Sequence, residues 1–189
     1  MSSSDTRQQL EFPSESNQST DETFTWDEVK EIMDKQIMRR AEYVTSVIVA
    51  MREHFGEEAL DIAAEAIYQI GFRKGVARSD LVLAQGEEND LESLSELIGH
   101  KMSRIYLGTT TEISENELTV QETYCPLPVY WKSIGMANDD IVRFCKIFDQ
   151  VDKGMIEGYN SDFTTDLSGA EELAIQGYCQ MVVRQKQVE

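Results

Sequence analysis

The hydrophobic pattern of this chain changes its period near Thr111, and no other feature constrains the fold as strongly. Before this point apolar residues recur every three or four positions, which places them on one face of a helix. Directly after it, apolar and polar residues alternate, as in a strand with one buried face. Helices followed by mostly antiparallel strands, with helices inserted between the strands, predict an α+β domain whose N-terminal helices cover one face of the sheet.

The helical part predicts three helices. Thr25 and Glu28 have the spacing of a capping box, in which each side chain satisfies a backbone donor of the other, so a long helix should begin there and end at Gly56. Two further helices are expected over residues 57–78 and 90–107, the first opened by acidic residues and the second capped by Asn or Asp.

The end of the second predicted helix carries two unusual features. Gly71 and Gly75 each weaken a helix, so they indicate close packing, a close backbone approach or fraying. Arg73, Lys74 and Arg78 form the one local basic cluster of an acidic chain. Arginine binds carboxylates through a two-pronged fork, so Arg73 or Arg78 could hold a substrate carboxylate, although charges that compensate the helix dipole explain the cluster more simply.

The strand-forming part begins with a predicted hairpin that turns at Glu115 and Asn116. Pro126 and Pro128 lack backbone donors and end the second strand. After them the pattern predicts a short helix, a longer helix, a weak strand and a well-alternating strand, over residues 129–135, 138–158, 163–167 and 173–184.

Composition limits the partners and the compartment. With 189 residues, 41% of them hydrophobic, the chain should form one domain over residues 23–189, preceded by a polar, flexible leader over residues 1–22. The net charge of −18 disfavours nucleic acid and anionic membranes as partners. The N-terminus lacks the features of a signal peptide and the chain has no apolar run long enough to span a membrane, so we expect a cytoplasmic protein with reduced cysteines.

Three cysteines in the last third of the chain are the candidate chemical groups. Cys145 and Asp149 are four residues apart and should share a helical face, where a partly desolvated carboxyl group could act as an acid or base. Cys125 lies between a strand and the first turn of a helix, where backbone donors and the helix dipole can lower a thiol pKa. A buried structural cysteine and a solvated aspartate are the simpler alternatives.

Other chemistry finds little support in the sequence. No close Cys-x-x-Cys or His-x-His pair favours a metal, and no cofactor motif occurs. His54 and His100 fit surface or capping roles better than that of a catalytic base.

The order and spacing of several segments resemble the L-2-amino-thiazoline-4-carboxylic acid hydrolase family. The likeness covers most of the chain after about residue 50 and is carried by the strand ending at Cys125, the Trp131–Gly135 segment, the turn from Phe144 to Asp149, the Glu157–Asn160 segment and the strand holding Cys179. The family usually has a shorter turn where this chain has residues 168–173.

The resemblance implies a cysteine-dependent hydrolase that opens a small sulfur- and nitrogen-containing ring at an amidine-like carbon to give an N-carbamoyl product. The positions that match the family are Cys125, Cys145, Asp149, Glu157, Asn160 and Cys179. Our hypothesis is that Cys125, or else Cys145, attacks the ring carbon while Asp149 moves protons or orients water. Glu157, Asn160 and Cys179 would then contact the substrate.

Two other interpretations stay open at this stage. The chain could be a non-catalytic domain that binds a small molecule, as related vinyl-reductase-type domains do, and its cysteines would then be inert toward alkylation. The long first helix could also pack against a second copy of the chain in a homo-oligomer.

Overall fold

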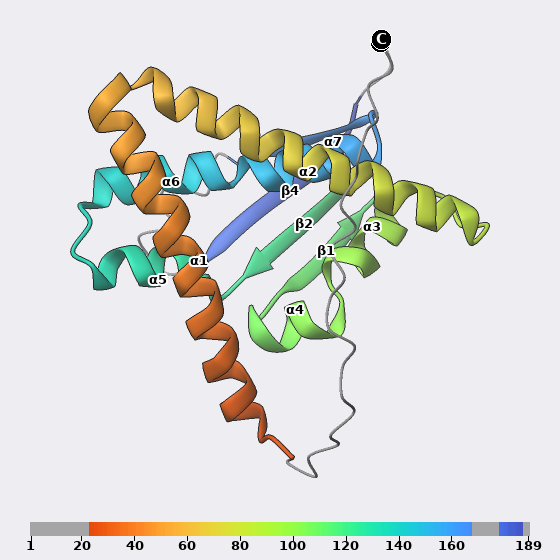
Figure 1. The fold of residues 1–189 in the computed structure, drawn as a ribbon. Coiled ribbons are helices and arrows are strands. Elements are labelled where there is room, and N and C mark those ends of the chain that lie inside the picture. Colours follow the sequence, from red (N-terminus) through yellow and green to blue (C-terminus); the bar gives the residue numbers. More distant parts are fainter. Residues whose placement is uncertain (1–22, 168–177, 187–189) are drawn as a thin grey trace, which may run out of the picture.

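The computed structural model describes residues 23–167 and 178–186. Within this part, helices precede and interrupt a four-stranded antiparallel sheet in the order β1-β2-β4-β3, so the predicted α+β class is confirmed (Figure 1). The leader over residues 1–22 and the predicted turn at residues 168–171 lie outside the described residues.

Two long helices form the N-terminal half of the fold. Helix α1 runs from Trp26 to Phe55, with the predicted capping box at its start and Gly56, at φ 82°, at its end. Helix α2 spans Glu58–Ala84 and does not end at its two glycines, because Gly71 and Gly75 pack against another helix. The helix predicted over residues 57–78 therefore continues to Ala84.

The third predicted helix is two helices. Helix α3 spans Leu91–Ile98 and is capped by the Asp90 side chain, whereas α4 spans Lys101–Tyr106 and is capped by His100, whose ring accepts a hydrogen bond from the Ser103 N–H. The division falls at Gly99, and glycine weakens a helix by about 1 kcal/mol relative to alanine. The predicted capping role of His100 is confirmed.

The sheet joins strands that are distant in sequence. Strands β1 (Thr110–Ser114) and β2 (Glu117–Glu122) form the predicted hairpin, while β3 (Phe163–Asp166) and β4 (Cys179–Gln185) complete the sheet. β4 lies between β2 and β3 and pairs antiparallel with both. In this register Glu122, the last residue of β2, is opposite Cys179, the first residue of β4.

Three helices lie between β2 and β3 along the chain. Helix α5 begins earlier than predicted and spans Pro126–Ser133, since proline is well suited to the first turn of a helix. The single helix predicted over 138–158 is instead α6 (Asn138–Phe148) and α7 (Gln150–Tyr159), joined at Asp149. Asp149 thus ends one helix and begins the next.

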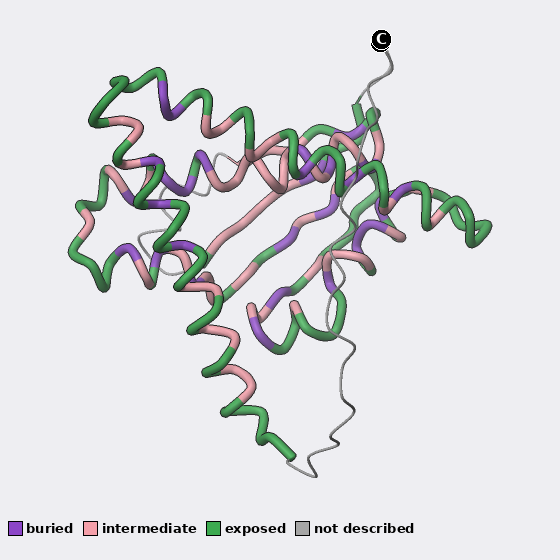
Figure 2. Tube along the Cα trace, viewed as in Figure 1, coloured by how far each residue is buried: buried purple, intermediate pink, exposed green. Residues whose placement is uncertain are grey.

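Two hydrophobic clusters hold these layers together. Leu118, Val120 and Val183 on one face of the sheet pack with Ile156 of α7 and Leu94 of α3. The second cluster joins α1, α2, α5 and α6 around the fully buried Trp131, Ile141 and Phe144. In Figure 2 the buried segments follow β2, α3, α6 and α7, whereas the outer faces of α1 and α2 are mostly exposed.

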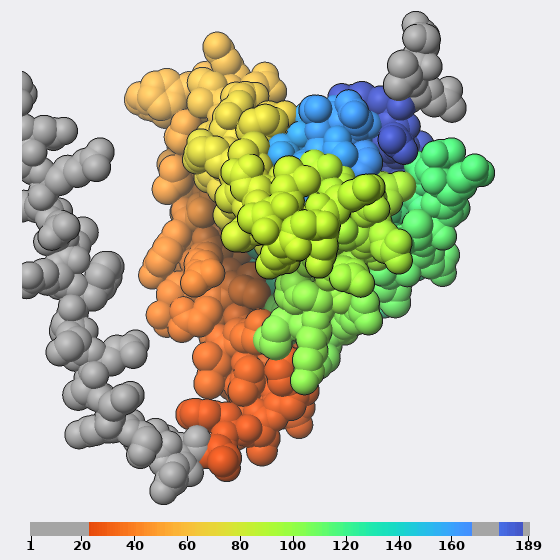
Figure 3. All heavy atoms as spheres, turned by 90° about the vertical axis from the view of Figure 1, so that its right-hand side faces the viewer, coloured from red at the N-terminus to blue at the C-terminus, as the bar shows by residue number. Residues whose placement is uncertain are grey.

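Helices α2 and α7 approach each other unusually closely, and their surfaces adjoin in Figure 3. A Cβ added at Gly154 would lie 2.2 Å from the Tyr68 carbonyl oxygen, and one added at Gly75 would lie 2.1 Å from the Met155 oxygen. Gly71 and Gly158 are as tightly placed. Of the alternatives that the sequence left open for Gly71 and Gly75, close packing is therefore correct. This contact fixes α7, which carries part of the candidate site.

Candidate functional site

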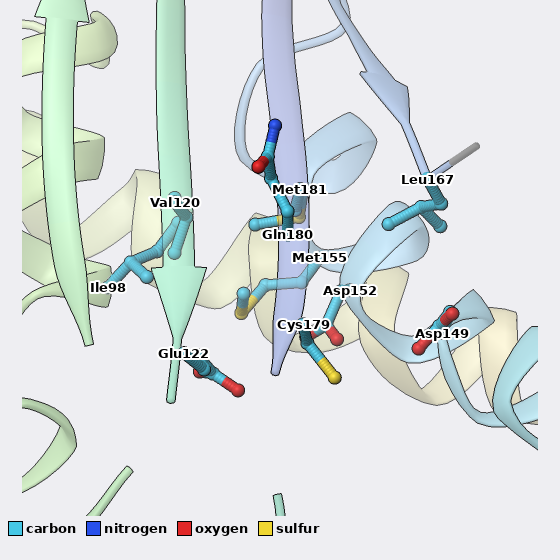
Figure 4. A pocket seen from close by; sticks show the side chains of 10 residues that line it. All are labelled: Ile98, Val120, Glu122, Asp149, Asp152, Met155, Leu167, Cys179, Gln180 and Met181. Atoms are coloured by element: carbon cyan, nitrogen blue, oxygen red, sulfur yellow. The ribbon is translucent and has the colours of Figure 1, made fainter. Parts of the chain in front are cut away.

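A small cavity opens beside the paired ends of β2 and β4, next to the start of α7 (Figure 4). Its volume is about 70 Å³, enough for a few water molecules or a small chemical group. One part of the wall is apolar, and the other carries three carboxyl groups and a thiol. The lining residues are Ile98, Val120, Glu122, Asp149, Asp152, Met155, Leu167, Cys179, Gln180 and Met181.

Secondary structure brings the polar lining groups together. Glu122 and Cys179 are register partners on neighbouring strands, so their backbones are adjacent. Asp149 stands at the junction of α6 and α7, and Asp152 follows within the first turn of α7. In Figure 4 the Cys179 side chain lies between Glu122 and Asp149, with Asp152 close to it.

All three cysteines gather at this end of the sheet. Cys125 is the N-cap residue of α5 and shares a hydrogen bond with Cys179. Cys145, on the last turn of α6, is buried and close enough to Asp149 and Cys179 for their charges to affect it. The three thiols, which the sequence scatters over more than fifty positions, therefore form one cluster with Asp149. Only Cys179 is among the residues that line the cavity.

The carboxyl groups bind their protons unusually tightly. Burial, followed by the charge of Asp152, raises the pKa of Glu122 to about 7, although a hydrogen bond with Thr109 opposes the rise. Burial and the charges of Asp152 and Glu122 raise the pKa of Asp149 to about 7. Asp152 reaches a pKa of about 6, because burial is partly offset by Arg78 and Lys74. Near neutral pH these groups can therefore both accept and release protons.

The thiols differ from what the sequence suggested. A hydrogen bond with Cys179, together with burial, raises the pKa of Cys125, and the Leu127 backbone amide opposes this rise only weakly. Burial and the Asp149 charge raise the pKa of Cys145 to about 12. The expected lowering of the Cys125 pKa is thus wrong, because the Cys179 thiol, burial and the Glu122 charge act on a group that the helix dipole alone would activate.

The two predicted substrate-binding arginines have different environments. Arg78 lies against α7, where its Nη1 is 3.3 Å from the sulfur of Met155 and its charge acts on Asp152. Because Met155 and Asp152 both line the cavity, Arg78 is near enough to contribute to the site. Arg73 is exposed and is not among the lining residues.

Glu157 and Asn160 lie apart from the cavity lining. The Tyr68 hydroxyl donates a hydrogen bond of 2.7 Å to Glu157, which links α2 to α7. Asn160 donates to the Asn89 carbonyl oxygen at 2.9 Å and accepts from the Asp162 N–H at 2.9 Å. These contacts show both residues holding neighbouring segments in place.

Glu122 and Asp152 are site residues that sequence reasoning missed. Glu122 continues the row formed by Leu118 and Val120, so the alternation already placed a carboxyl group on the buried face of a strand. Asp152 follows Asp149 by three residues and shares its side of the helix. Both signals were present in the sequence, but neither indicates by itself that the two residues meet.

A second polar contact supports the segment before Cys125. The hydroxyls of Tyr106 and Tyr124 both donate to the same Asp34 oxygen, each at 2.7 Å. The Lys30 ammonium lies 5.0 Å from the centre of the Tyr124 ring. Asp34 and Lys30 belong to α1, so this helix is tied to the residue directly preceding Cys125.

Two features are absent from residues 23–167 and 178–186. No group of three or more His, Cys, Asp or Glu side chains there is arranged to hold a metal ion. None of the helices in this part combines the length and the apolar character needed to cross a membrane.

The fold and the cavity are those of a small α+β domain with a thiol- and carboxyl-lined site. The model of the L-2-amino-thiazoline-4-carboxylic acid hydrolase family matches residues 35–172, which is more than half of the chain. The chain therefore belongs to this family, and the resemblance noted from its sequence is confirmed.

One solved structure has a similar fold. It is that of a trafficking protein particle complex subunit 3 from Naegleria fowleri, covalently bound to palmitic acid. The TM-score is 0.52 at 14% identity, with 83% of this chain and 97% of that chain covered, so the likeness concerns the fold alone. A search of curated proteins found no match.

Proposed function

We propose that this chain is a cysteine-dependent hydrolase acting on a small sulfur- and nitrogen-containing heterocycle or another amidine-like amino-acid derivative. The observation that carries the proposal is a cavity lined by Cys179 and three carboxyl groups, with Cys125 and Cys145 clustered next to Cys179, in a chain of a hydrolase family. Such a site contains both a nucleophile and groups able to move protons near neutral pH.

The cavity wall favours Cys179 as the attacking thiol over Cys125 and Cys145. Its proton passes to a carboxylate, Glu122 or Asp149, while the sulfur bonds to the amidine-like carbon. The ring carbon–sulfur bond then breaks, and the carboxyl group returns the proton to the departing ring sulfur. Water next attacks the same carbon, which releases an N-carbamoyl product and restores the Cys179 thiol. Cys125 orients Cys179 through their hydrogen bond.

Turnover of 2-amino-thiazoline-4-carboxylate tests this proposal, because opening its ring produces a free thiol that a colorimetric reagent detects. Cys179→Ser should lower kcat by at least about a hundredfold, as loss of a nucleophile does. Cys145→Ser is the matched comparison, since its thiol lies in the α6 core and should affect stability more than turnover. Full turnover by Cys179→Ser would exclude it as the nucleophile, and Cys125→Ser would then test the second thiol.

The non-catalytic alternative makes a different prediction. A domain that only binds a small molecule would show no turnover of this substrate or of related cyclic amidines by the unmodified chain, yet would be stabilised by one of them in a thermal unfolding assay. Iodoacetamide labelling of Cys125 and Cys145 does not separate the two, because the raised pKa values of these thiols predict slow labelling either way.

A further inference from the structure

The middle of helix α1 is apolar on two opposite sides, and the fold covers one of them. Ala41, Thr45 and Ile48 form the buried side, where the Thr45 hydroxyl accepts a hydrogen bond from the Trp131 indole. The stretch from Tyr43 to Met51 contains no charged side chain. A surface helix normally carries polar groups on its outer face, and a helix that is apolar all round is normally buried. The composition of this stretch is therefore that of a helix with a second packing partner.

The outer side of the same stretch exposes large apolar side chains. Tyr43 is 63% exposed, Val47 59% and Val44 41%. Ala50, one turn further along the helix, is exposed as well. Figure 2 shows this outer face of α1 as mostly exposed. Single apolar residues on a surface need no explanation, but a contiguous group of them marks an interaction site.

The spacing of the exposed residues is that of a coiled-coil seam. Arg40, Tyr43, Val47, Ala50 and His54 follow one another at alternating intervals of three and four residues, and all of them are exposed. This pattern keeps one face of a helix in contact with a neighbouring helix along its length. The seam from Arg40 to His54 is about 20 Å long. It is therefore suited to packing along a second helix.

We propose that the occupant of this seam is helix α1 of a second copy of the chain, which runs antiparallel to the first across a twofold axis. The axis passes between Tyr43 and Val47, so that Tyr43 of each copy packs against Val47 of the other. One turn outward, Arg40 of each copy lies against Ala50 of the other. The same surface is used by both copies, as twofold symmetry requires. This interface does not depend on the proposed hydrolase reaction.

The charges beside the seam favour a second copy and determine its direction. Arg39 and Glu53 are exposed, and each directly precedes a seam residue, Arg40 and His54 respectively. Because they occupy equivalent positions of the repeat, the antiparallel arrangement brings Arg39 of each copy beside Glu53 of the other, twice in the dimer. A parallel pair would instead place Arg40 against Arg40 of the second copy. Like charges brought together disfavour that alternative.

The distribution of charge over the chain also favours α1 as the contact surface. The net charge of −18 makes two copies repel each other. The stretch from Lys35 to Arg52 is an exception to the acidic excess, because it contains four basic residues and a single acidic one, Glu42. Two copies can therefore approach through this part of α1 with less repulsion than through surfaces that carry the acidic excess.

Sedimentation velocity of the full chain tests the proposal. A seam of this length is at the small end of specific interfaces, so the dimer should dissociate with a Kd of about 1 to about 100 μM. Between about 1 and about 300 μM, the mass should rise from the 21.5 kDa of one chain toward twice that value. A species of 21.5 kDa at all concentrations would overturn the proposal and leave the face to a different protein or segment.

A matched pair of substitutions locates the interface. Val47→Glu places two carboxylates at the centre of the dimer, against Tyr43, and should raise Kd at least about a hundredfold. Leu81→Glu is the control, because Leu81 is 63% exposed on α2 and the change adds the same charge away from the seam. Its Kd should stay within about threefold of the parent value. Circular dichroism should show both variants folded, and equally tight dimers in the two would refute the seam.

Two charge reversals test the direction of the helices. Arg39→Glu and Glu53→Arg each place like charges at both Arg39–Glu53 contacts and should raise Kd about tenfold or more. In an equimolar mixture, the acidic pair of one variant meets the basic pair of the other, and the mixed dimer should form with a Kd within about threefold of the parent value. Weak dimers alone and recovery in the mixture support the antiparallel seam. A mixture without recovery, or reversals without any loss, would overturn it.

Discussion

Replacing Gly154 with Ala tests how closely helices α2 and α7 must pack. The new Cβ would lie 2.2 Å from the Tyr68 carbonyl oxygen and 2.9 Å from the Phe72 nitrogen, both backbone atoms that no side-chain rotation can move aside. Ordinary contact begins at 3.4 Å, so the helices must separate by more than 1 Å. That shift would loosen the cluster in which Ile156 and Tyr159 are buried.

The expected magnitude follows from two opposing effects. Alanine in place of glycine stabilises a helix by about 1 kcal/mol. Overpacking against backbone, together with the loosened cluster, costs several times as much, so Gly154→Ala should lower the free energy of unfolding by about 3 kcal/mol and the Tm by roughly 10 °C.

Urea unfolding followed by far-UV circular dichroism measures this change. Ala66→Gly, on the exposed face of α2, is the calibrating variant and should lose only the propensity difference of about 1 kcal/mol. If Gly154→Ala were as stable as the parent chain, or more stable, the contact would be too loose to fix α7 and the placement of Asp152 would have to be reconsidered.

Three further predictions address the site and its supports. Folding raises the pKa values of Glu122, Asp149 and Asp152, so the stability that their protonation contributes is full below the unfolded-state pKa and is lost as pH rises through about 6 to about 7. Urea unfolding should therefore show that the free energy of unfolding falls from about pH 5 to about pH 8. Asp149→Asn should flatten this dependence. Thr45→Val removes the acceptor of the 2.9 Å hydrogen bond from the buried Trp131 indole and should cost about 2 kcal/mol in the same assay; no loss would mean that the indole N–H finds another acceptor. Tyr124→Phe breaks one of the two hydrogen bonds to Asp34 and should lower the free energy of unfolding by about 1 kcal/mol and also lower kcat. Tyr106→Phe breaks the other and should cost a similar amount of stability but leave kcat nearly unchanged. Equal effects on kcat would contradict the idea that Tyr124 positions Cys125.

The sequence predicted the order and type of most elements, because local signals determine them. The capping box at Thr25, the hairpin turn after Ser114 and the alternation through Val183 each act within a few residues. The errors concern boundaries where local and tertiary preferences compete. Gly75 would weaken an isolated helix, but here its missing side chain permits α7 to approach, and α2 continues past it.

The candidate site was predicted only in part, since it depends on the pairing of β2 with β4. Cys125, Cys145, Asp149 and Cys179 were named from the sequence and do come together, whereas the position of Glu122 beside Cys179 follows from a register that no local pattern specifies. The direction of the Cys125 pKa was wrong for the same reason. The N-terminus of α5, which would lower the pKa of Cys125, can be recognised from the local sequence. The thiol and the carboxylate that raise this pKa belong to other elements, and the local sequence does not show that they lie near Cys125.

The central position of β4 also decides when the site can exist during synthesis. β2 leaves the ribosome more than fifty residues before β4, and until then Leu118 and Val120 belong to an open sheet edge with unpaired backbone groups. Closing such a long segment is a slow, non-local event, and the open edge favours aggregation until it is complete. Because residues of both β2 and β4 line the cavity, the cavity, and with it any stabilising ligand, can form only after β4 has joined the sheet.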